Sequence, residues 1–252
     1  MFDCFVTSNP RARRVGWAIA CVVALSACAV PTLAPVEEPG GVPVAAVVPL
    51  AEATEWHAVH FPGKRATEYR HEQKEGRIAV AARADRSASM WRRNVVRSAD
   101  RLGEVEFSWW VQAMPNNADV SQAEFADAPA RVMFAFAGDT RRLSARNQML
   151  FDLAHVLSGE PLPFATLIYV WDAKAPVGSV IVNPRSDRIR KIVVESGTTG
   201  LRQWRSYRRN LAADFRLAFG EAPGSLQAMA VMTDGDNTQS QLATWYGEIT
   251  LH

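Results

Sequence analysis

Cysteine is scarce in this chain of 252 residues, and its three cysteines, Cys4, Cys21 and Cys28, all lie within the first 28 residues. The long remainder contains no cysteine, so no disulfide can form within it. A domain built from this remainder must be stabilised by its own hydrophobic core. The chain is 48% hydrophobic, and a segment of about two hundred residues is large enough to bury such a core.

Recognisable catalytic motifs are absent as well. The sequence has no glycine-rich phosphate loop, no pair of metal-binding cysteines and no dinucleotide fingerprint. Asp152 and His155, three residues apart on a predicted helix, have no identifiable nucleophile and are interpreted as a surface pair. The paired carboxylates of a glycosidase need no fixed spacing, so Glu106 with Asp172 or with Glu248 stays open as a catalytic pair.

The N-terminal segment has the pattern of a lipoprotein signal peptide. Three arginines between positions 11 and 14 precede an apolar stretch, residues 15–27, that is too short to span a bilayer comfortably. The stretch ends in Leu25-Ser26-Ala27-Cys28, in which small residues precede a cysteine. We predict that residues 1–27 are removed and that Cys28 is lipidated. An uncleaved membrane anchor and an ordinary secretory signal are the alternatives.

A surplus of charge is also missing once that segment is removed. The whole chain has 28 basic and 26 acidic residues, and residues 1–27 contain three arginines and Asp3, so 25 of each remain. A mature chain without net charge gives no electrostatic reason to bind nucleic acid. We therefore predict no nucleic-acid partner.

Residues 28–53 join the acylated Cys28 to the rest of the chain through a segment rich in proline, alanine and valine. Proline-rich segments favour an extended geometry of about 3 Å per residue, so this one is predicted to be a tether. A disordered leader with no length requirement is the alternative. Because Ala29 rather than aspartate follows Cys28, we expect anchoring to the outer membrane, facing the periplasm.

Residues 54–252 are predicted to form a single, mainly β domain. In residues 104–111 the apolar side chains of Val105, Phe107 and Trp109 recur at every second position, as in a strand with one buried face. Many short strands indicate an antiparallel β-sandwich of jelly-roll type. Strands are predicted at residues 56–61, 68–73, 78–84, 89–95, 104–111, 131–136, 167–172, 179–182, 189–195, 226–232 and 244–251.

Two amphipathic helices are predicted to interrupt the strands, at about residues 144–157 and 203–219. The first ends before Gly159 and Pro161, which are typical stop signals. The second places Trp204, Tyr207 and Phe215 roughly on one face and ends at Gly220.

Five segments of the chain together resemble a bacterial exported family catalogued as domain-of-unknown-function family 3047. They occur in the expected order and are YVWDAKAPVGSVIVNP (residues 169–184), RKIVVESG (190–197), LRQWRSYRRNLAADFRLAFGEAPG (201–224), MAVMTDGDNT (229–238) and WYGEI (245–249). The resemblance covers residues 56–249 and implies no activity, ligand or catalytic residue. More distantly, WYGEITL is similar to the last strand of galactose-binding-like jelly rolls, which implies sugar binding without catalysis.

Aromatic residues are the first binding candidates, because sugar rings stack on flat side chains. Strand alternation places Trp110 opposite Trp109 and Tyr246 opposite Trp245, so Trp110 and Tyr246 are favoured as ligand-binding residues. Trp171 is a further candidate whose face is undetermined. The alternative for each of them is a place in the core of the sandwich.

Four arginines between residues 202 and 209 form a basic cluster at the start of the second predicted helix. Arg205 and Arg208 are candidates for binding an anionic lipid or an acidic envelope glycan, because a guanidinium group pairs well with phosphate and carboxylate groups. A solvated face paired with Asp214 and Glu221 is the alternative.

The segment 233–238, Thr-Asp-Gly-Asp-Asn-Thr, follows an apolar strand and carries closely spaced oxygen ligands. Asp234, Asp236 and Asn237 are candidate metal ligands, and calcium is the cofactor that such oxygens favour. The spacing of an EF-hand is absent, and an ordinary Asp-Gly turn is the alternative.

These observations favour a membrane-anchored envelope lipoprotein whose β-sandwich binds a ligand, a glycan above all, without catalysis, and no catalytic residue is assigned. One alternative is an enzyme that cleaves polysaccharides with paired carboxylates. Another is an envelope assembly or scaffold protein, which would need an exposed apolar patch. The ligand and the oligomeric state are not determined by the sequence.

Overall fold

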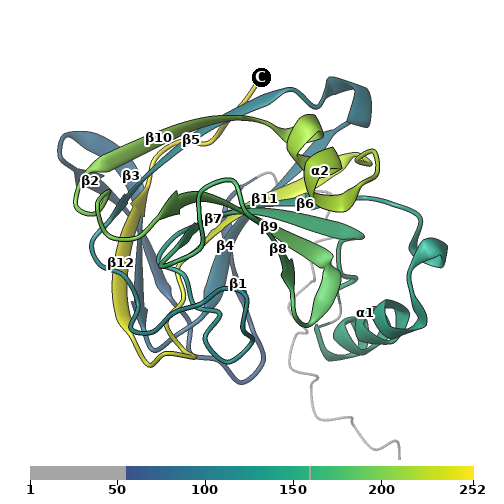
Figure 1. Cartoon of the computed structure of the whole chain (residues 1–252), viewed down its shortest axis with the longest axis horizontal. Helices are drawn as coiled ribbons and strands as arrows, with labels where there is room; N and C mark the ends of the chain where they lie inside the picture. The colour runs from purple at the N-terminus through teal and green to yellow at the C-terminus, as the bar shows by residue number, and fades with distance from the viewer. Residues whose placement is uncertain (1–54, 159) are drawn as a thin grey trace, which may run out of the picture. The chain divides into compact units, whose positions relative to one another are not determined.

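The structure is a computed structural model and describes residues 55–158 and 160–252. The signal peptide, Cys28 and the tether therefore lie outside the described residues. The described part of the chain folds into two β-sheets packed face to face, with two α-helices beside them (Figure 1).

The first sheet has seven strands and the second has six. In spatial order, the first contains β1 (His57–His60), β4 (Ser89–Arg97), β11 (Leu226–Met232), β6 (Arg131–Phe136), β7 (Ala165–Asp172), β9 (Ser186–Ser196) and β8 (Val180–Asn183). The second contains β10 (Trp204–Asn210), β5 (Glu104–Val111), β12 (Gln241–Tyr246), β3 (Arg77–Asp85) and β2 (Glu68–Lys74), and β13 (Thr250–Leu251) pairs with β5. All of these pairs are antiparallel except β7 with β9, which is parallel.

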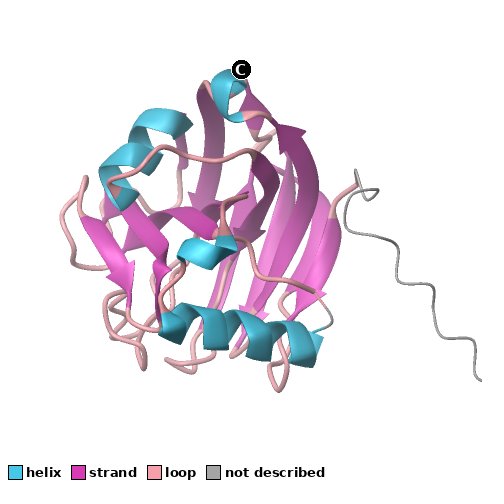
Figure 2. Cartoon of the chain, turned by 90° about the vertical axis from the view of Figure 1, so that its right-hand side faces the viewer, coloured by secondary structure: helices cyan, strands magenta, loops and turns pink. Residues whose placement is uncertain are grey.

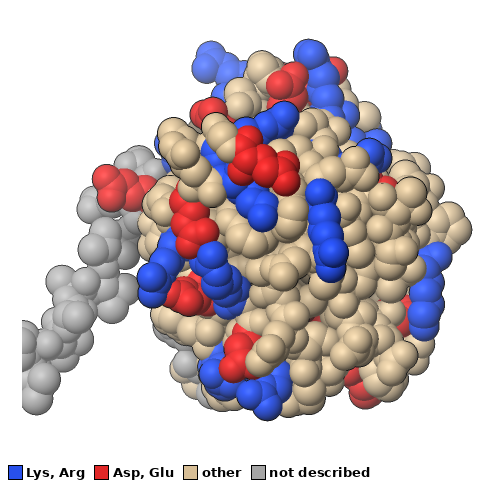
Figure 3. Space-filling view, turned by 90° about the vertical axis from the view of Figure 1, so that its left-hand side faces the viewer, with Lys and Arg blue, Asp and Glu red and all other residues tan. Residues whose placement is uncertain are grey.

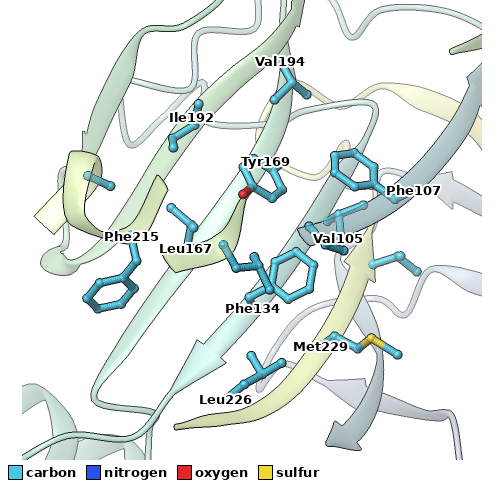
Figure 4. Packing of buried hydrophobic residues seen from close by; sticks show 14 of the residues in the cluster. Val105, Phe107, Phe134, Leu167, Tyr169, Ile192, Val194, Phe215, Leu226 and Met229 are labelled. Atoms are coloured by element: carbon cyan, nitrogen blue, oxygen red, sulfur yellow. The ribbon is translucent and has the colours of Figure 1, made fainter. Parts of the chain in front are cut away.

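The core lies between the two sheets and is built by strand alternation. On β5, Val105, Phe107 and Trp109 face inward as predicted, and each is at most 2% exposed. They meet Phe134 of β6 and Tyr169 of β7 from the opposite sheet, and the rings of Phe107 and Tyr169 stack at 5.3 Å (Figure 4). The predicted jelly-roll type of β-sandwich is confirmed.

Each predicted strand coincides with an observed one, and the last is divided into β12 and β13 at Gly247. One prediction is wrong: residues 204–210 form strand β10 and not the first half of a helix. This segment pairs along its whole length with β5, and the cross-strand contacts override its helix-like spacing of apolar residues. The helix begins only after Asn210, whose side chain accepts a hydrogen bond of 2.9 Å from the backbone N–H of Ala213.

The two α-helices are α1 (Ala145–Ser158) and α2 (Leu211–Phe219), and there are two short 3₁₀-helices, η1 (Ala99–Arg101) and η2 (Thr140–Arg142). The predicted helix at 144–157 corresponds to α1, which lies across the direction of the strands behind it (Figure 2). In α2, Asp214 accepts hydrogen bonds from Tyr169 of β7 and from Arg209, and these bonds attach the helix to both sheets. Among the described residues, no helix is long and apolar enough to span a bilayer.

Candidate functional site

Three tryptophans form a row across the outer face of the six-stranded sheet, which we call the tryptophan strip. Trp204 of β10 pairs with Trp110 of β5, and Trp110 pairs with Trp245 of β12. Residues paired in this way point to the same face of a sheet. The rings of Trp110 and Trp245 meet edge to face at 5.1 Å, and Trp204 packs beside them.

The hairpin between β2 and β3 covers most of this strip. Its turn residues Glu75 and Gly76 both have positive φ angles, 50° and 78°, as a tight two-residue turn requires. The Lys74 ammonium lies 3.6 Å from the Trp110 ring centre and 4.2 Å from that of Trp245, in cation–π contact. Trp110 and Trp245 are consequently buried, whereas Trp204 at the sheet edge remains partly exposed.

All three indole N–H groups donate to this hairpin. Trp110 donates to the Glu75 carboxylate at 2.9 Å, and Trp204 donates to the Lys74 carbonyl at 3.3 Å. Trp245 donates to Glu72 at 3.2 Å. Hydrogen bonds from Arg83 also hold the pKa of the Glu72 carboxyl below its usual value. The indoles are therefore held in fixed positions. Of the three tryptophans only Trp204 is partly exposed, and the Arg77 guanidinium lies 5.1 Å from the centre of its ring.

A polar pocket of about 310 Å³ continues the outer face along β5 and β10. Ser108 and Ser206 face each other two residues from Trp110 and Trp204, and Glu106 faces Arg208 two residues further on. Glu248 lines the same pocket. Figure 3 views the molecule from the side of β2, β3 and β12 and shows basic and acidic side chains interspersed over the surface.

Close contact between two backbone segments shapes this pocket. The chain leaves β12 at Gly247, whose backbone N–H donates to the Ser108 carbonyl at 2.9 Å. A Cβ atom at Gly247 would lie 2.3 Å from the Ser108 hydroxyl oxygen, so a larger residue there would displace the serine. This contact between Gly247 and Ser108 brings Glu248 into the same pocket as Ser108 and Ser206. Hydroxyl, carboxylate and guanidinium groups therefore line one open pocket, two residues along the strands from Trp204 and Trp110.

Of the predicted aromatic ligand-binding residues, only Trp110 belongs to this face. Trp171 is fully buried in the core, and its indole N–H donates to the Gly197 carbonyl at 2.8 Å. Tyr246 does lie on the opposite face from Trp245, but its side chain points into the core and the residue is only 2% exposed. Its hydroxyl donates a hydrogen bond to the carbonyl of Met232 in the other sheet at 2.7 Å. It also shares a hydrogen bond of 2.8 Å with the hydroxyl of Thr233. Tyr246 and Trp171 thus lie in the core of the sandwich, which was the alternative interpretation for each of them.

The predicted arginine cluster is divided by strand geometry. Arg205 and Arg208 are three residues apart on β10 and so face opposite sides of the sheet. Arg205 pairs with Glu195 at 2.8 Å, whereas Arg208 pairs with Glu104 and Glu106 at the polar pocket. Of the two predicted anionic partners, Asp214 pairs with Arg209, but Glu221 pairs with arginines outside the cluster. Only Arg208 therefore remains at the candidate site.

Three residues of the site were missed by the sequence analysis: Trp204, Ser206 and Ser108. Trp204 was assigned to the apolar face of a helix that does not exist there. Read as a strand, residues 204–208 place Trp204, Ser206 and Arg208 on one face. The N-cap signal of Asn210 could have shown that the helix starts later.

The acidic loop after β11 forms a second constellation inside the sandwich. Asp234 and Asp236 lie with Asp127 so that one carboxylate oxygen from each is within 4.8 Å of the others. Asp127 comes from the long connection between β5 and β6 and was not predicted. Asn237 instead donates its side-chain N–H to the Ala123 carbonyl at 3.2 Å.

Side chains of the protein already neutralise two of these carboxylates. Arg131 donates to Asp234 at 2.8 Å, and Lys64 forms an ion pair with Asp236. Asp127 accepts hydrogen bonds from the backbone and hydroxyl of Thr238, at 2.6 and 2.7 Å. The five charged residues, Lys64, Asp127, Arg131, Asp234 and Asp236, are called the charge cluster below; Lys64 is its exposed member. This cluster attaches the acidic loop to β6 and to the connection that precedes it.

Calcium would have to compete with Arg131 and Lys64 for the same oxygens. We therefore expect that dialysis of the protein against EGTA changes its melting temperature by less than about 1 °C, which for a domain of this size is a few tenths of a kcal/mol. Differential scanning fluorimetry with and without millimolar calcium measures this. An increase of several degrees on adding calcium would instead show that calcium displaces the two cations and stabilises the fold.

A buried lysine lies near the same cluster. Lys191 of β9 is 2% exposed and donates to the Val120 carbonyl. Burial lowers the pKa of its ammonium group to about 7, and Arg131 adds to this effect. Burial also raises the pKa of Asp234 to about 6, and Arg131 opposes that rise. Burial therefore moves the pKa values of both groups toward neutrality in the folded protein.

The Lys191 shift predicts a pH dependence of stability. Between the folded pKa of about 7 and the unfolded value of about 10.4, the unfolded chain binds one more proton. The contribution of Lys191 to the unfolding free energy therefore rises with pH, by up to about 1.4 kcal/mol per pH unit. Urea titrations at pH 7.5 and 9.5 should show that the unfolding free energy of the wild type increases with pH relative to that of Lys191→Met. Lys174→Met, at an exposed position, should not change the slope, and equal slopes for all three would contradict the assignment.

Comparison with known proteins identifies the family of the chain. The family described as protein of unknown function (DUF3047) matches residues 54–250. The chain belongs to this family. The family resemblance inferred from the five segments is thereby confirmed. No curated protein matches the chain.

Solved structures similar to this DUF3047 protein share little sequence with it. A family 11 carbohydrate-binding module of a Clostridium thermocellum cellulase has 7% identity and a TM-score of 0.37, over 78% of this chain and 86% of the module. A Cel12A cellulase derived from Rhodothermus marinus has 10% identity and a TM-score of 0.40, over 79% of this chain and all of the cellulase. The xyloglucanase domain of NopAA from Sinorhizobium fredii has 6% identity and a TM-score of 0.40, over 78% and 98%. At these TM-scores the likenesses carry no functional argument.

Proposed function

We propose that this protein binds a glycan, without cleaving it, on the outer face of its six-stranded sheet. One observation carries the proposal: the partly exposed Trp204 lies two residues along β10 from Ser206, which lines an open pocket of about 310 Å³ together with carboxylate and guanidinium groups. A sugar ring has an apolar face that stacks on an indole and a polar rim that needs hydrogen-bond partners. Trp204 would stack the ring, and Ser108, Ser206, Glu106 and Arg208 would bind its hydroxyls.

Binding to purified polysaccharides tests this proposal. A soluble chain of residues 29–252, which lacks Cys28 but contains every described residue, is titrated by calorimetry with a panel of envelope polysaccharides, with and without calcium. We expect saturable binding to at least one of them. Reversal of the pocket charge in Arg208→Glu should weaken binding of an acidic glycan, whereas Arg205→Glu on the other face should not. Absence of binding across the panel would overturn the proposal.

A second candidate function is cleavage of the same glycan. Glu106 and Glu248 line one pocket, and a pair of carboxylates can serve as general acid and as base or nucleophile. The alternative partner Asp172 does not line this pocket. Its carboxylate accepts hydrogen bonds from the backbone N–H groups of Lys174, Ala175 and Val120. Release of new reducing ends by the wild type, and its loss in Glu248→Gln with binding retained, would favour cleavage over binding.

The proposed binding domain is anchored to the envelope through an acylated Cys28. The lipobox and the proline-rich segment after it support this part of the proposal. Mass spectrometry of the mature chain should show an acylated N-terminal cysteine, and Cys28→Ser should move the protein out of the outer-membrane fraction. A mature chain without acyl groups at Cys28 would contradict the anchor but would leave the glycan proposal intact.

A further inference from the structure

The outer face of the seven-stranded sheet carries an apolar groove of about 450 Å³. Its floor consists of small side chains, Ala135 of β6 and Ala228 and Ala230 of β11, which alternate with large residues that face the core. The segment from Pro161 to Phe164 forms a wall, and Phe61 also lines the groove. Small residues on the floor between larger ones on the rim leave a trench that crosses several strands.

The groove continues toward α1. A second cavity of about 310 Å³ shares Leu162, Pro163, Thr166 and Ile189 with the groove. Its remaining lining comes from α1, from the turn between β8 and β9 and from the start of β9, and consists of Leu150, Phe151, Leu153, Ala154, Arg185, Ser186 and Arg188. The two spaces lie on either side of the same short segment. Their volumes fall in the range of about 300–1,000 Å³ that is usual for small-molecule sites. An elongated apolar ligand fits such a pair of adjoining spaces better than a rounded one.

One cation stands in this apolar groove. Arg92 of β4 pairs across the sheet with Ala230 of the floor and lines the groove. Its side chain is only 14% exposed, and one Nη donates to Glu160 at 3.0 Å. Its Nε is buried and has no hydrogen-bond partner. A buried donor without a partner is unfavourable, and an anionic group in the groove would accept a hydrogen bond from it.

We propose that this groove binds the acyl chain of a fatty acid, with the carboxylate at Arg92. The apolar floor and walls provide the surface for the chain, and the free Nε of Arg92 pairs with the headgroup. A glycan does not suit this site, because the groove offers no tryptophan and few polar groups for hydroxyls. Met90 and Met133 also line it and supply flexible side chains that adapt to a bound chain. The site lies on the other sheet from the glycan site and does not depend on it.

Calorimetry with dodecanoate, below the concentration at which it forms micelles, tests the proposal on the soluble chain of residues 29–252, which lacks Cys28. Dodecanol provides the same chain without the charge, and phosphatidylglycerol vesicles provide a lipid surface instead of a free ligand. We expect dodecanoate to bind in a 1:1 ratio, about tenfold or more tightly than dodecanol, as the loss of a charge-assisted contact implies.

Matched variants separate the headgroup contact from the groove. Arg92→Gln should weaken dodecanoate about tenfold and leave dodecanol unchanged, whereas Arg93→Gln, at the adjacent exposed position, should change neither. Ala230→Leu fills the floor and should weaken both ligands. Melting temperatures show whether each variant is folded. No binding of dodecanoate, binding to vesicles alone, or equal affinities for Arg92→Gln and the wild type would overturn the proposal.

Discussion

Replacing Asp234 with alanine is expected to destabilise the domain by about 3–5 kcal/mol, because the change leaves Arg131 as a buried charge without its partner. The side chains of Arg131 and Asp234 are 8% and 6% exposed and are 2.8 Å apart. The variant also removes the acceptor of the Ala128 backbone N–H, at 3.1 Å. A loss of this size is a large part of the stability of an ordinary domain. Urea unfolding followed by circular dichroism measures it.

Two further variants control for this effect. Asp85→Ala removes an exposed carboxylate that pairs with Arg65 and Arg86 and should have a much smaller effect, because exposed ion pairs contribute little to stability. The double variant Arg131→Met with Asp234→Leu removes both charges and should recover much of the lost stability, because apolar residues of similar size often replace a buried ion pair without cost. A loss below about 1 kcal/mol for Asp234→Ala would contradict the importance of the pair.

Replacing Trp204 with alanine is expected to weaken glycan binding by about tenfold to a hundredfold, which corresponds to roughly 1.4–2.8 kcal/mol of binding free energy. Trp204 is the partly exposed member of the tryptophan strip and lies two residues from Ser206 of the polar pocket, so its loss removes the proposed stacking surface. Calorimetry with the polysaccharide that binds the wild type measures the change. Trp204→Phe retains an aromatic ring and should recover part of the affinity.

A matched control separates binding from folding. Trp56 is also a partly buried tryptophan, but it packs against the core cluster and not on the strip. Trp56→Ala should therefore lower stability without changing the affinity for the glycan. If Trp204→Ala bound as tightly as the wild type while Trp56→Ala bound more weakly, the site would not lie on the outer face of the six-stranded sheet.

The fold could be predicted from local patterns to a large extent. Alternation of apolar residues identified strands such as β5 and β6, because a half-buried strand repeats its buried side chains every second residue. The same reasoning failed at β10. There Trp204 and Tyr207 are three residues apart, a spacing that suits one face of a helix, whereas in a strand they lie on opposite faces. Pairing with β5 decides in favour of the strand.

The candidate site was predictable only in part. Trp110 was correctly separated from Trp109, since neighbours on a strand face opposite sides. Tyr246 was assigned to the ligand-binding side, but its hydroxyl connects the two sheets through Met232 and Thr233. Alternation shows that two residues lie on different faces, and it does not show which face is covered by the other sheet.

The sequence by itself determined the family, the strand segments, the first helix and the prediction of a lipidated Cys28, because each depends on residues that are close together in the chain. Only the tertiary structure decided which groups share a site. Ser108 and Ser206 meet through strand pairing, Asp127 approaches Asp234 from another loop, and Arg92 lies in its groove because β4 pairs with β11. These contacts depend on register and packing between distant segments, which local periodicity does not specify.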